Sequence, residues 1–224
     1  MKTVIKLVVV LLSTTVFAQG KLEKETGKFD ELKVFDGISV NLVKSDQNKV
    51  VVSGEDSDKV AVVNNNGRLK IRMEIDKIFS GYRTFATVYY NGRLTLLDVN
   101  ENASIKGDDV IEEVSLELRA QEGGEIDVKT DVQRLIVKSV TGGKIEAIGD
   151  AINQTITVNT GGNYEGDRLV TEQTSVTVNA GGTAYINASE YVKASVKAGG
   201  TIRIYGNPKV IDKKRFLGGK IIEQ

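Results

Sequence analysis

Apolar and polar residues alternate in short runs throughout the second half of the chain, and pairs of adjacent glycines separate these runs. A period of two residues on both sides of a glycine pair predicts β-strands that bury one face and expose the other. An amphipathic helix would repeat its apolar residues every three and four positions, and no long stretch does so. The pairs recur after 19, 19, 20 and 18 residues, at Gly123-Gly124, Gly142-Gly143, Gly161-Gly162, Gly181-Gly182 and Gly199-Gly200.

Alignment of the glycine pairs sorts the surrounding residues into apolar and polar columns. The apolar columns predict the interior, and they contain Leu118, Val137, Ile156, Val176, Ala194, Ala120, Ser139, Val158, Val178, Val196, Ile126, Ile145, Tyr164, Ala184, Ile202, Val128, Ala147, Gly166, Ile186 and Ile204. A polar column after the corner predicts a row of outward side chains. This row contains Glu146, Glu165, Tyr185 and Arg203, and Tyr205 takes the next outward position.

A repeat of about 19 residues with glycine at its corner predicts an all-β solenoid whose coils stack about 4.8 Å apart. Five to six coils would form a rod roughly 25–30 Å long at that spacing. We expect a right-handed parallel β-helix, because parallel crossover connections take that hand. Antiparallel hairpins joined at the glycine pairs are the alternative, which explains the alternation but not the near-constant period.

The first half of the chain lacks this repeat. Asn-Gly between alternating apolar runs is a strong hairpin signal, and it occurs within residues 64–67 and at Asn91-Gly92. We therefore expect residues 19–106 to form an N-terminal antiparallel β region that caps the solenoid, and residues 107–224 to form the β-helix. Residues 107–113 are either the boundary between the two parts or a degenerate coil.

Residues 1–18 have the pattern of a secretory signal peptide. Lys2 and Lys6 precede a mostly apolar stretch, and Val16-Phe17-Ala18 provides a cleavage site before Gln19. A membrane anchor is the weaker alternative, because residues 7–17 at about 1.5 Å each cannot cross a hydrocarbon core of about 30 Å. We therefore expect an exported protein in the periplasm, at the cell surface or secreted, with no membrane span.

The composition removes several classes of chemistry. The chain has no histidine and no cysteine, which excludes Ser-His-Asp and Cys-His catalysis and metal sites built on imidazole or thiolate. We expect neither a cofactor nor a metal site. Without the leader, 30 − 2 = 28 basic residues stand against 30 acidic ones, so charge gives no reason to expect nucleic acid as a partner.

Three further features of the sequence belong together: the opening Phe35-Asp36-Gly37-Ile38-Ser39-Val40, the glycine-pair coils, and the closing Tyr205-Gly206-Asn207-Pro208-Lys209-Val210 and Gly218-Gly219-Lys220-Ile221. In these segments the chain resembles the head GIN domain family, the auto-transporter adhesin family of exported proteins in Bacteroidetes-type bacteria. Ser39 departs from the asparagine that the family name suggests. The resemblance covers most of the chain from about Phe29 onward, and it implies a β-helical exported domain with no catalytic residues to carry over.

Carboxylates are the general acid–base groups that remain. They cluster in sequence at Asp108, Asp109, Glu112 and Glu113, and at Glu55, Asp56 and Asp58. A polysaccharide-cleaving enzyme needs two such groups roughly 5–10 Å apart in a cleft, which proximity in sequence does not show. Solvated turns are the simpler interpretation. Neither run has the alternating oxygen ligands of a calcium loop.

We expect a non-enzymatic protein with a structural or adhesive role at the cell envelope, which binds a glycan or a protein on one face. Tyrosine and arginine of the outward row can bind sugar rings or partner proteins, although the simpler interpretation is that each residue of the row is a solubilising surface residue of a strand. Two alternatives stay open. One is a polysaccharide lyase or hydrolase that uses surface carboxylates, and the other is envelope-stress or assembly work with a protein partner.

Overall fold

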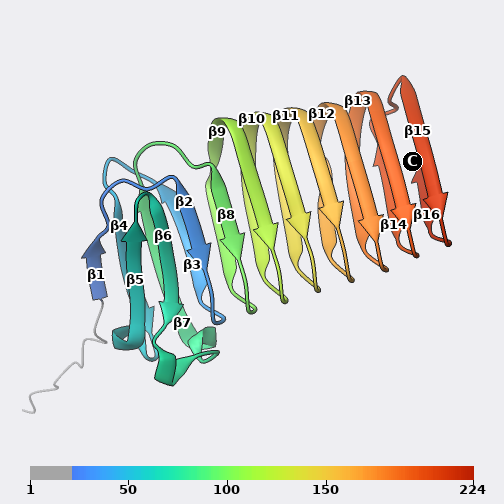
Figure 1. Ribbon diagram of the computed structural model, residues 1–224. Coiled ribbons are helices and arrows are strands. Elements are labelled where there is room, and N and C mark those ends of the chain that lie inside the picture. The colour runs from blue at the N-terminus through green and yellow to red at the C-terminus, as the bar shows by residue number, and fades with distance from the viewer. Residues whose placement is uncertain (1–21) are drawn as a thin grey trace, which may run out of the picture.

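The computed structural model describes residues 22–224, which form an elongated all-β molecule (Figure 1). Short 3-10 helices interrupt the N-terminal part at η1 (Ser57–Lys59), η2 (Ile75–Lys77) and η3 (Gly81–Arg83). The strands are β1 (Leu22–Glu25), β2 (Glu31–Val34), β3 (Ser39–Lys44), β4 (Lys49–Gly54), β5 (Val60–Asn65), β6 (Arg68–Met73), β7 (Thr84–Tyr90), β8 (Leu96–Val99), β9 (Ser104–Ala120), β10 (Glu125–Ser139), β11 (Lys144–Val158), β12 (Asn163–Asn179), β13 (Thr183–Lys197), β14 (Thr201–Tyr205), β15 (Val210–Phe216) and β16 (Lys220–Glu223).

Each long strand from β9 to β13 bends in its middle and contributes its two halves to two facing ladders (Figure 1). We call the ladder of the first halves the first sheet; it runs β1-β4-β7-β3-β9-β10-β11-β12-β13-β14-β16. The second sheet contains the second halves and runs β5-β6-β2-β8-β9-β10-β11-β12-β13-β15. From β9 onward all pairing is parallel, and it brings equivalent positions together, such as Val128 with Ala147 and Val137 with Ile156.

The predicted right-handed parallel solenoid is confirmed. In Figure 1 the second sheet descends in front toward the glycine corners, the first sheet ascends behind, and the chain advances to the right, which is right-handed winding. The solenoid has about seven coils rather than the expected five to six. The expected number of coils included only coils with a glycine pair. The corner at residues 100–103 has no such pair, because Asn102, with a φ of 57°, stands in place of the first glycine.

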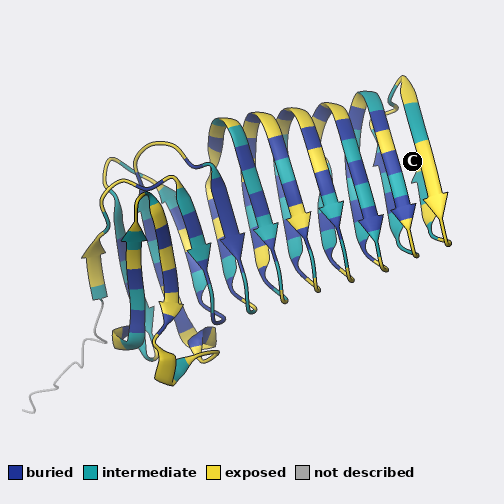
Figure 2. Cartoon of the chain, in the orientation of Figure 1, coloured by how far each residue is buried: buried dark blue, intermediate teal, exposed yellow. Residues whose placement is uncertain are grey.

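The predicted interior columns are confirmed, because every one of their twenty positions is buried. Figure 2 shows the resulting alternation of buried and more exposed positions along the long strands β9 to β13. The interior also accommodates one large side chain, the fully buried Tyr164. A Cβ at the neighbouring Gly166 would lie 2.4 Å from the Tyr164 ring, so the glycine provides the space. The Tyr164 hydroxyl donates to Gln154 Oε1 at 3.0 Å, which satisfies both groups in the core.

The two glycines of a corner have different physical roles. Gly142 has a φ of 74° and open space where a Cβ would stand, so its backbone conformation alone favours glycine. A Cβ on Gly143 would lie 2.2 Å from the carbonyl oxygen of Ala120 in the coil before it. The second glycine is therefore required by the close stacking of one corner on the next.

The N-terminal part joins the solenoid without a break in either sheet. Antiparallel pairing is found at its outer strands, between β1 and β4, β4 and β7, and β5 and β6. Nearer the solenoid, β2 pairs in parallel with β8, and β3 pairs in parallel with β9. Strand β9 continues across residues 107–113, where its register with β10 shifts. The antiparallel strands thus lie at the N-terminal end of the solenoid.

One predicted hairpin is confirmed and the other is wrong. Residues 64–67 connect the antiparallel strands β5 and β6. Asn91-Gly92 joins β7, which lies in the first sheet, to β8, which lies in the second sheet, and these two strands do not pair. The Asn-Gly turn here serves as a bend between sheets, because each flanking strand finds its partner in a distant segment.

No helix within residues 22–224 is long and apolar enough to cross a membrane. The predicted signal peptide, residues 1–18, lies outside the described residues.

Substitution of the two corner glycines should separate their roles. Gly142→Ala should lower the free energy of unfolding by about 1–2 kcal/mol, the cost of a left-handed backbone for an ordinary residue. Gly143→Ala should cost about 3 kcal/mol or more, because its Cβ has no space against Ala120. Urea denaturation followed by circular dichroism measures both values.

Gly142→Asn is the matched control, because Asn102 occupies the equivalent corner position with a φ of 57°. It should cost less than Gly142→Ala. Equal losses for Gly142→Ala and Gly143→Ala would contradict the assignment of a stacking role to the second glycine alone.

Candidate functional site

The predicted outward row lies on the first sheet, and its members are consecutive register partners. Glu146 pairs with Glu165, Glu165 with Tyr185, and Tyr185 with Arg203. Tyr205 lies two residues further along β14, opposite Asn187 of β13. All five predicted side chains are half-buried, because their neighbours on the sheet cover their stems. The structure therefore brings the predicted residues together on one face.

Neighbouring strands supply partners of opposite charge to this row. Glu146 pairs with Arg168, and Glu165 lies 3.3 Å from Lys144 Nζ. The Arg203 guanidinium lies 5.9 Å from the centre of the Tyr185 ring, within the range of a cation–π contact. These contacts hold the side chains of the row in place across successive coils.

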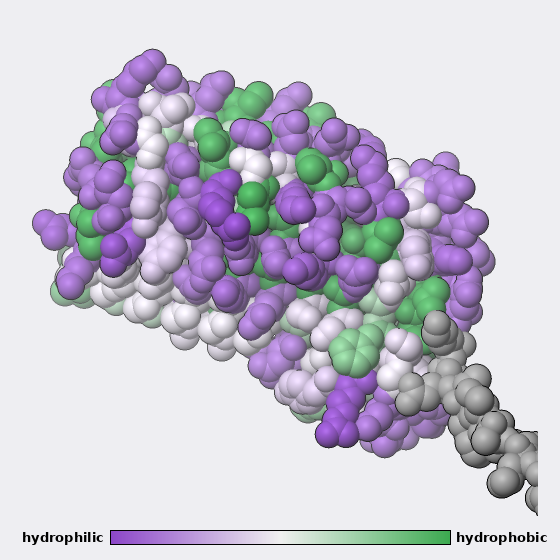
Figure 3. Space-filling view, turned by 180° about the vertical axis from the view of Figure 1, so that it is seen from behind, coloured by the Kyte–Doolittle hydropathy of each residue, from purple (hydrophilic) through white to green (hydrophobic). Residues whose placement is uncertain are grey.

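Figure 3 shows this face, which looks away from the viewer in Figure 1. Hydrophilic side chains cover most of it, with single apolar side chains between them, and the glycine corners form a near-neutral band along its lower edge. A shallow depression of about 290 Å³ lies over β9, β10 and β11, and Lys106, Asp127 and Glu146 line it. The face can therefore offer charged hydrogen-bonding groups and the rings of Tyr185 and Tyr205 to a large ligand.

The carboxylates that cluster in sequence fasten loops to the body of the protein. Asp109 accepts a hydrogen bond from the backbone N–H of Lys44 at 2.9 Å. Glu113 accepts from the Leu94 N–H at 2.9 Å and lies 3.3 Å from Arg93 Nε. These contacts provide a structural reason for the run of acidic residues after Gly107.

The second acidic run has similar contacts. Glu55 lies 2.9 Å from Arg83 Nη1, and Asp56 lies 3.2 Å from Lys77 Nζ. Both ion pairs connect the loop after β4 to the segment between β6 and β7. Within residues 22–224, no group of three or more acidic side chains is arranged to hold a metal ion.

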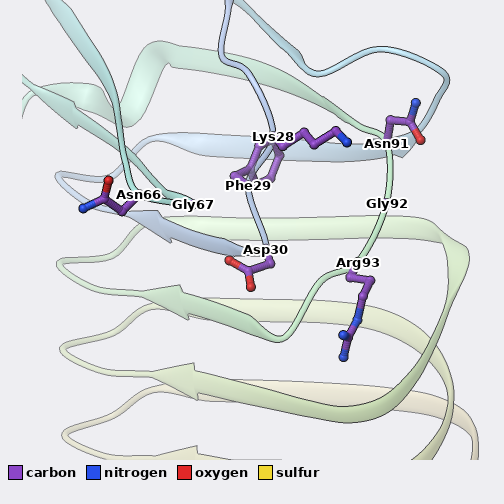
Figure 4. Close-up of a pocket in the computed structure, with 8 residues that line it drawn as sticks. All are labelled: Lys28, Phe29, Asp30, Asn66, Gly67, Asn91, Gly92 and Arg93. Atoms are coloured by element: carbon purple, nitrogen blue, oxygen red, sulfur yellow. The ribbon is translucent and has the colours of Figure 1, made fainter.

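A pocket of about 610 Å³ lies beside the N-terminal strands, where three loops meet (Figure 4). The loop before β2 supplies Lys28, Phe29 and Asp30, the β5–β6 turn supplies Asn66 and Gly67, and the bend between the sheets supplies Asn91, Gly92 and Arg93. In Figure 4 the Lys28 side chain extends toward the Asn91 loop. Phe29 is buried, so the pocket offers polar groups and no open aromatic face.

Side chains behind the pocket tie its loops together. The Asn64 amide donates to the carbonyl oxygens of Thr26 and Lys28 at 2.8 and 2.9 Å. The backbone N–H of Asn91 donates to Asn48 Oδ1 at 2.8 Å. Since these bonds hold the loops, the pocket is formed before a ligand arrives. Its lining offers the cations of Lys28 and Arg93, the Asp30 carboxylate and two asparagine amides to a small polar ligand.

No sequence motif marks this pocket. Its residues come from three segments that are 24 or more positions apart along the chain, and two of these segments show only the asparagine and glycine typical of a turn. The pairing of β2 with β6 and β8 brings them together.

A charged groove of about 390 Å³ lies next to the pocket on the second sheet and shares Arg93 with it. Glu117 binds Arg119 and Lys138 there, at 2.8 Å from each. Burial alone would raise the pKa of Glu117, but the hydrogen bonds from Arg119 and Lys138 together lower it below its ordinary value. Glu117 is thus a structural anion on this face.

The opening motif forms one of the solenoid corners. Asp36 and Gly37 have φ values of 61° and 77°, like the corner residues of the glycine-pair coils. The buried Asp36 carboxylate accepts hydrogen bonds from the backbone N–H groups of Met73 and Phe79 at 3.0 and 3.2 Å. Asp36 therefore fastens the inserted segment that contains η2 and η3 to the corner.

A second carboxyl lies close to this anchor. Glu101 occupies the next corner, and partial burial, followed by the charge of Asp36, raises the pKa of Glu101 above its ordinary value. Its ionised form is thus less stable in the folded protein than in the unfolded chain.

Comparison with known proteins identifies the family. The model described as "Putative auto-transporter adhesin, head GIN domain" matches residues 28–208, which begin just before the corner formed by Asp36 and Gly37. The chain belongs to the head GIN domain family. The resemblance in the opening motif and the glycine corners is thereby confirmed. No curated protein matches this head GIN domain chain.

Solved structures share the fold. A "putative adhesin" from Bacteroides fragilis has a TM-score of 0.84 at 17% identity, over 91% of this chain and 96% of that one. A "putative adhesin" from Parabacteroides distasonis has a TM-score of 0.71 at 16% identity, over 92% of this chain and 96% of that one. A "putative lipid binding protein" from the same species has a TM-score of 0.68 at 16% identity, with coverage of 91% and 96%. At these identities the likeness establishes the fold alone.

Replacement of Glu101 should stabilise the protein at neutral pH. Because its folded-state pKa is raised, the ionised carboxyl lowers stability as the pH rises above the ordinary glutamate value. Glu101→Gln should therefore raise the free energy of unfolding at pH 7, by less than about 1 kcal/mol because water screens the group. The gain should disappear in acid, where the carboxyl is protonated.

Thermal unfolding across a pH series measures this effect. Glu122→Gln, at the equivalent position of the next corner, is the control and should show a smaller gain. A Glu101→Gln variant that is less stable than the parent at pH 7 would refute the role assigned to this pair of carboxyl groups.

Proposed function

We propose that this head GIN domain protein is an exported, non-enzymatic binding protein of the cell envelope, which presents its first sheet to a glycan or a protein. The observation that carries the proposal is the register of the outward row. Glu146, Glu165, Tyr185 and Arg203 follow one another on adjacent strands, at the spacing of about 4.8 Å that stacked strands impose. Tyr205 extends the row along β14.

The contacts within the row support a binding role. Each acidic side chain of the row lies against a cation from a neighbouring coil, and Tyr185 lies against Arg203. Side chains that are already ordered lose less freedom when a partner binds. Tyrosine and arginine are also the residues that contribute most often to binding energy at interfaces.

Export and an envelope location rest on the leader-like residues 1–18 and on the family. The absence of cysteine is compatible with this location, since the hydrophobic core and backbone ladders can hold the fold without disulfides. The similar structures that are named adhesins support a binding role for this chain, and the one named a lipid-binding protein makes lipid a further ligand to include in a screen.

The alternative is a polysaccharide lyase or hydrolase that uses surface carboxylates. Such an enzyme needs two free carboxyl groups on either side of a cleft. The candidates Asp109, Glu113, Glu55 and Asp56 instead make hydrogen bonds or ion pairs that hold loops. These contacts favour the binding role over the enzymatic one.

A glycan array, together with a panel of purified envelope proteins and lipid vesicles, tests the proposal. The double variant Tyr185→Ala/Arg203→Ala should weaken binding at least about tenfold, as the loss of central aromatic and arginine contacts does at other interfaces. Tyr191→Ala/Lys193→Ala is the matched control, because it removes a tyrosine and a cation from the second sheet of the same coil. The control should bind within about twofold of the parent, as expected for substitutions outside an interface.

A polysaccharide cleavage panel is run with the same protein. Equal losses for the two double variants would contradict binding through the first sheet. Turnover that a single carboxylate substitution abolishes would replace the proposal with the enzymatic alternative.

A further inference from the structure

The last coil departs from the apolar pattern of the interior. Its register places charged residues at positions that are buried and apolar in the coil before it. The pairs are Ala194 with Lys213, Val196 with Arg215, and Ile204 with Glu223. Because paired residues of a parallel ladder project to the same side, three interior columns end in a charge.

The contacts of these residues agree with an inward direction. Lys213 comes from the second sheet and Glu223 from the first, and their side chains form an ion pair across the end of the solenoid. The two side chains remain 40% and 54% exposed, because no other coil within residues 22–224 covers them. Ile211 and Ile221, on the same two strands, still pack against the core. The change from apolar to charged residues therefore affects only the later inward positions of each strand, which are Lys213, Arg215 and Glu223.

The two strands of this coil are also open edges. Among residues 22–224, β15 pairs with β13 alone and β16 pairs with β14 alone. Their outer N–H and C=O groups could therefore accept another strand, as open sheet edges do in aggregating proteins. At the opposite end, β1, β4 and β5 run antiparallel to their neighbours, so the two ends of the molecule present different edges.

We propose that Lys213, Arg215 and Glu223 form an end cap that prevents a second copy of this chain from adding its own last coil to β15 and β16. A two-fold pairing is the natural contact for identical edges, because each copy presents the same surface to the other. It would enclose two lysines and two arginines with only two glutamates. Enclosure of charge that is not fully paired is strongly unfavourable, so the edges stay apart.

The alternation of β15 provides an internal control. Asp212 pairs with Lys193 and Lys214 pairs with Ser195, which are outward positions. These two charges would remain in water after end-to-end pairing. Their removal changes the charge of the edge strand but not the charge that pairing would enclose.

The mass in solution tests the proposal, with protein purified from cells that express the full chain. Lys213→Val/Arg215→Val/Glu223→Val should change the protein from one copy to two at the concentrations where the parent is a single copy. Asp212→Val/Lys214→Val should remain a single copy. Light scattering after size-exclusion chromatography, over a wide concentration range, measures this mass. A closed pair is expected rather than a filament, because the N-terminal ends differ from the joined ends.

A triple variant that remains a single copy at the highest concentration would overturn the proposal, as would a parent protein that is already paired or a control variant that associates equally. Should the triple valine variant fail to fold by circular dichroism, Lys213→Met/Arg215→Met/Glu223→Gln replaces it. These substitutions keep most of the side-chain volume and remove the charge, and the same doubling of mass is expected.

Discussion

The stacking of each coil directly on the one before it, at the spacing of hydrogen-bonded strands, is the constraint on which the rest of this structure depends. A Cβ at Gly143 would meet the Ala120 carbonyl at 2.2 Å, so the corner itself sets which residue can stand there. The same stacking places like positions above one another from β9 to β16. Each column therefore has a single environment, which is the interior, the surface or a corner.

The columns also explain why the surface is organised as rows. Side chains on adjacent coils lie close enough to interact directly, so Glu146 and Glu165 each need a cation beside them, and Arg168 and Lys144 supply it. The result is an ordered polar face of the kind that a binding protein of the head GIN domain family can present. At the coil of β15 and β16 the interior columns change to Lys213, Arg215 and Glu223, which no other coil within residues 22–224 covers.

Much of this arrangement was predictable, for a physical reason. In a stacked solenoid the residue period along the chain and the register between strands are the same quantity, so alignment of the glycine pairs placed Tyr164 inside and Tyr185 outside. Prediction failed where the corner residue changed or where strand pairing was not local. Asn102 replaces a glycine in one corner, and Asn91-Gly92, which resembles a hairpin turn, connects strands of two different sheets.

The sequence by itself determined the strands, their inward and outward faces, the corners of the glycine-pair coils and the row from Glu146 to Arg203. These features follow from local alternation and from a repeat length, both of which one chain displays directly. Only the tertiary structure decided that β2 and β3 continue the ladders of β8 and β9, and that the loops at Lys28, Asn66 and Asn91 meet in one pocket. Those contacts join segments that share no repeat, so their sequences do not indicate which segment pairs with which.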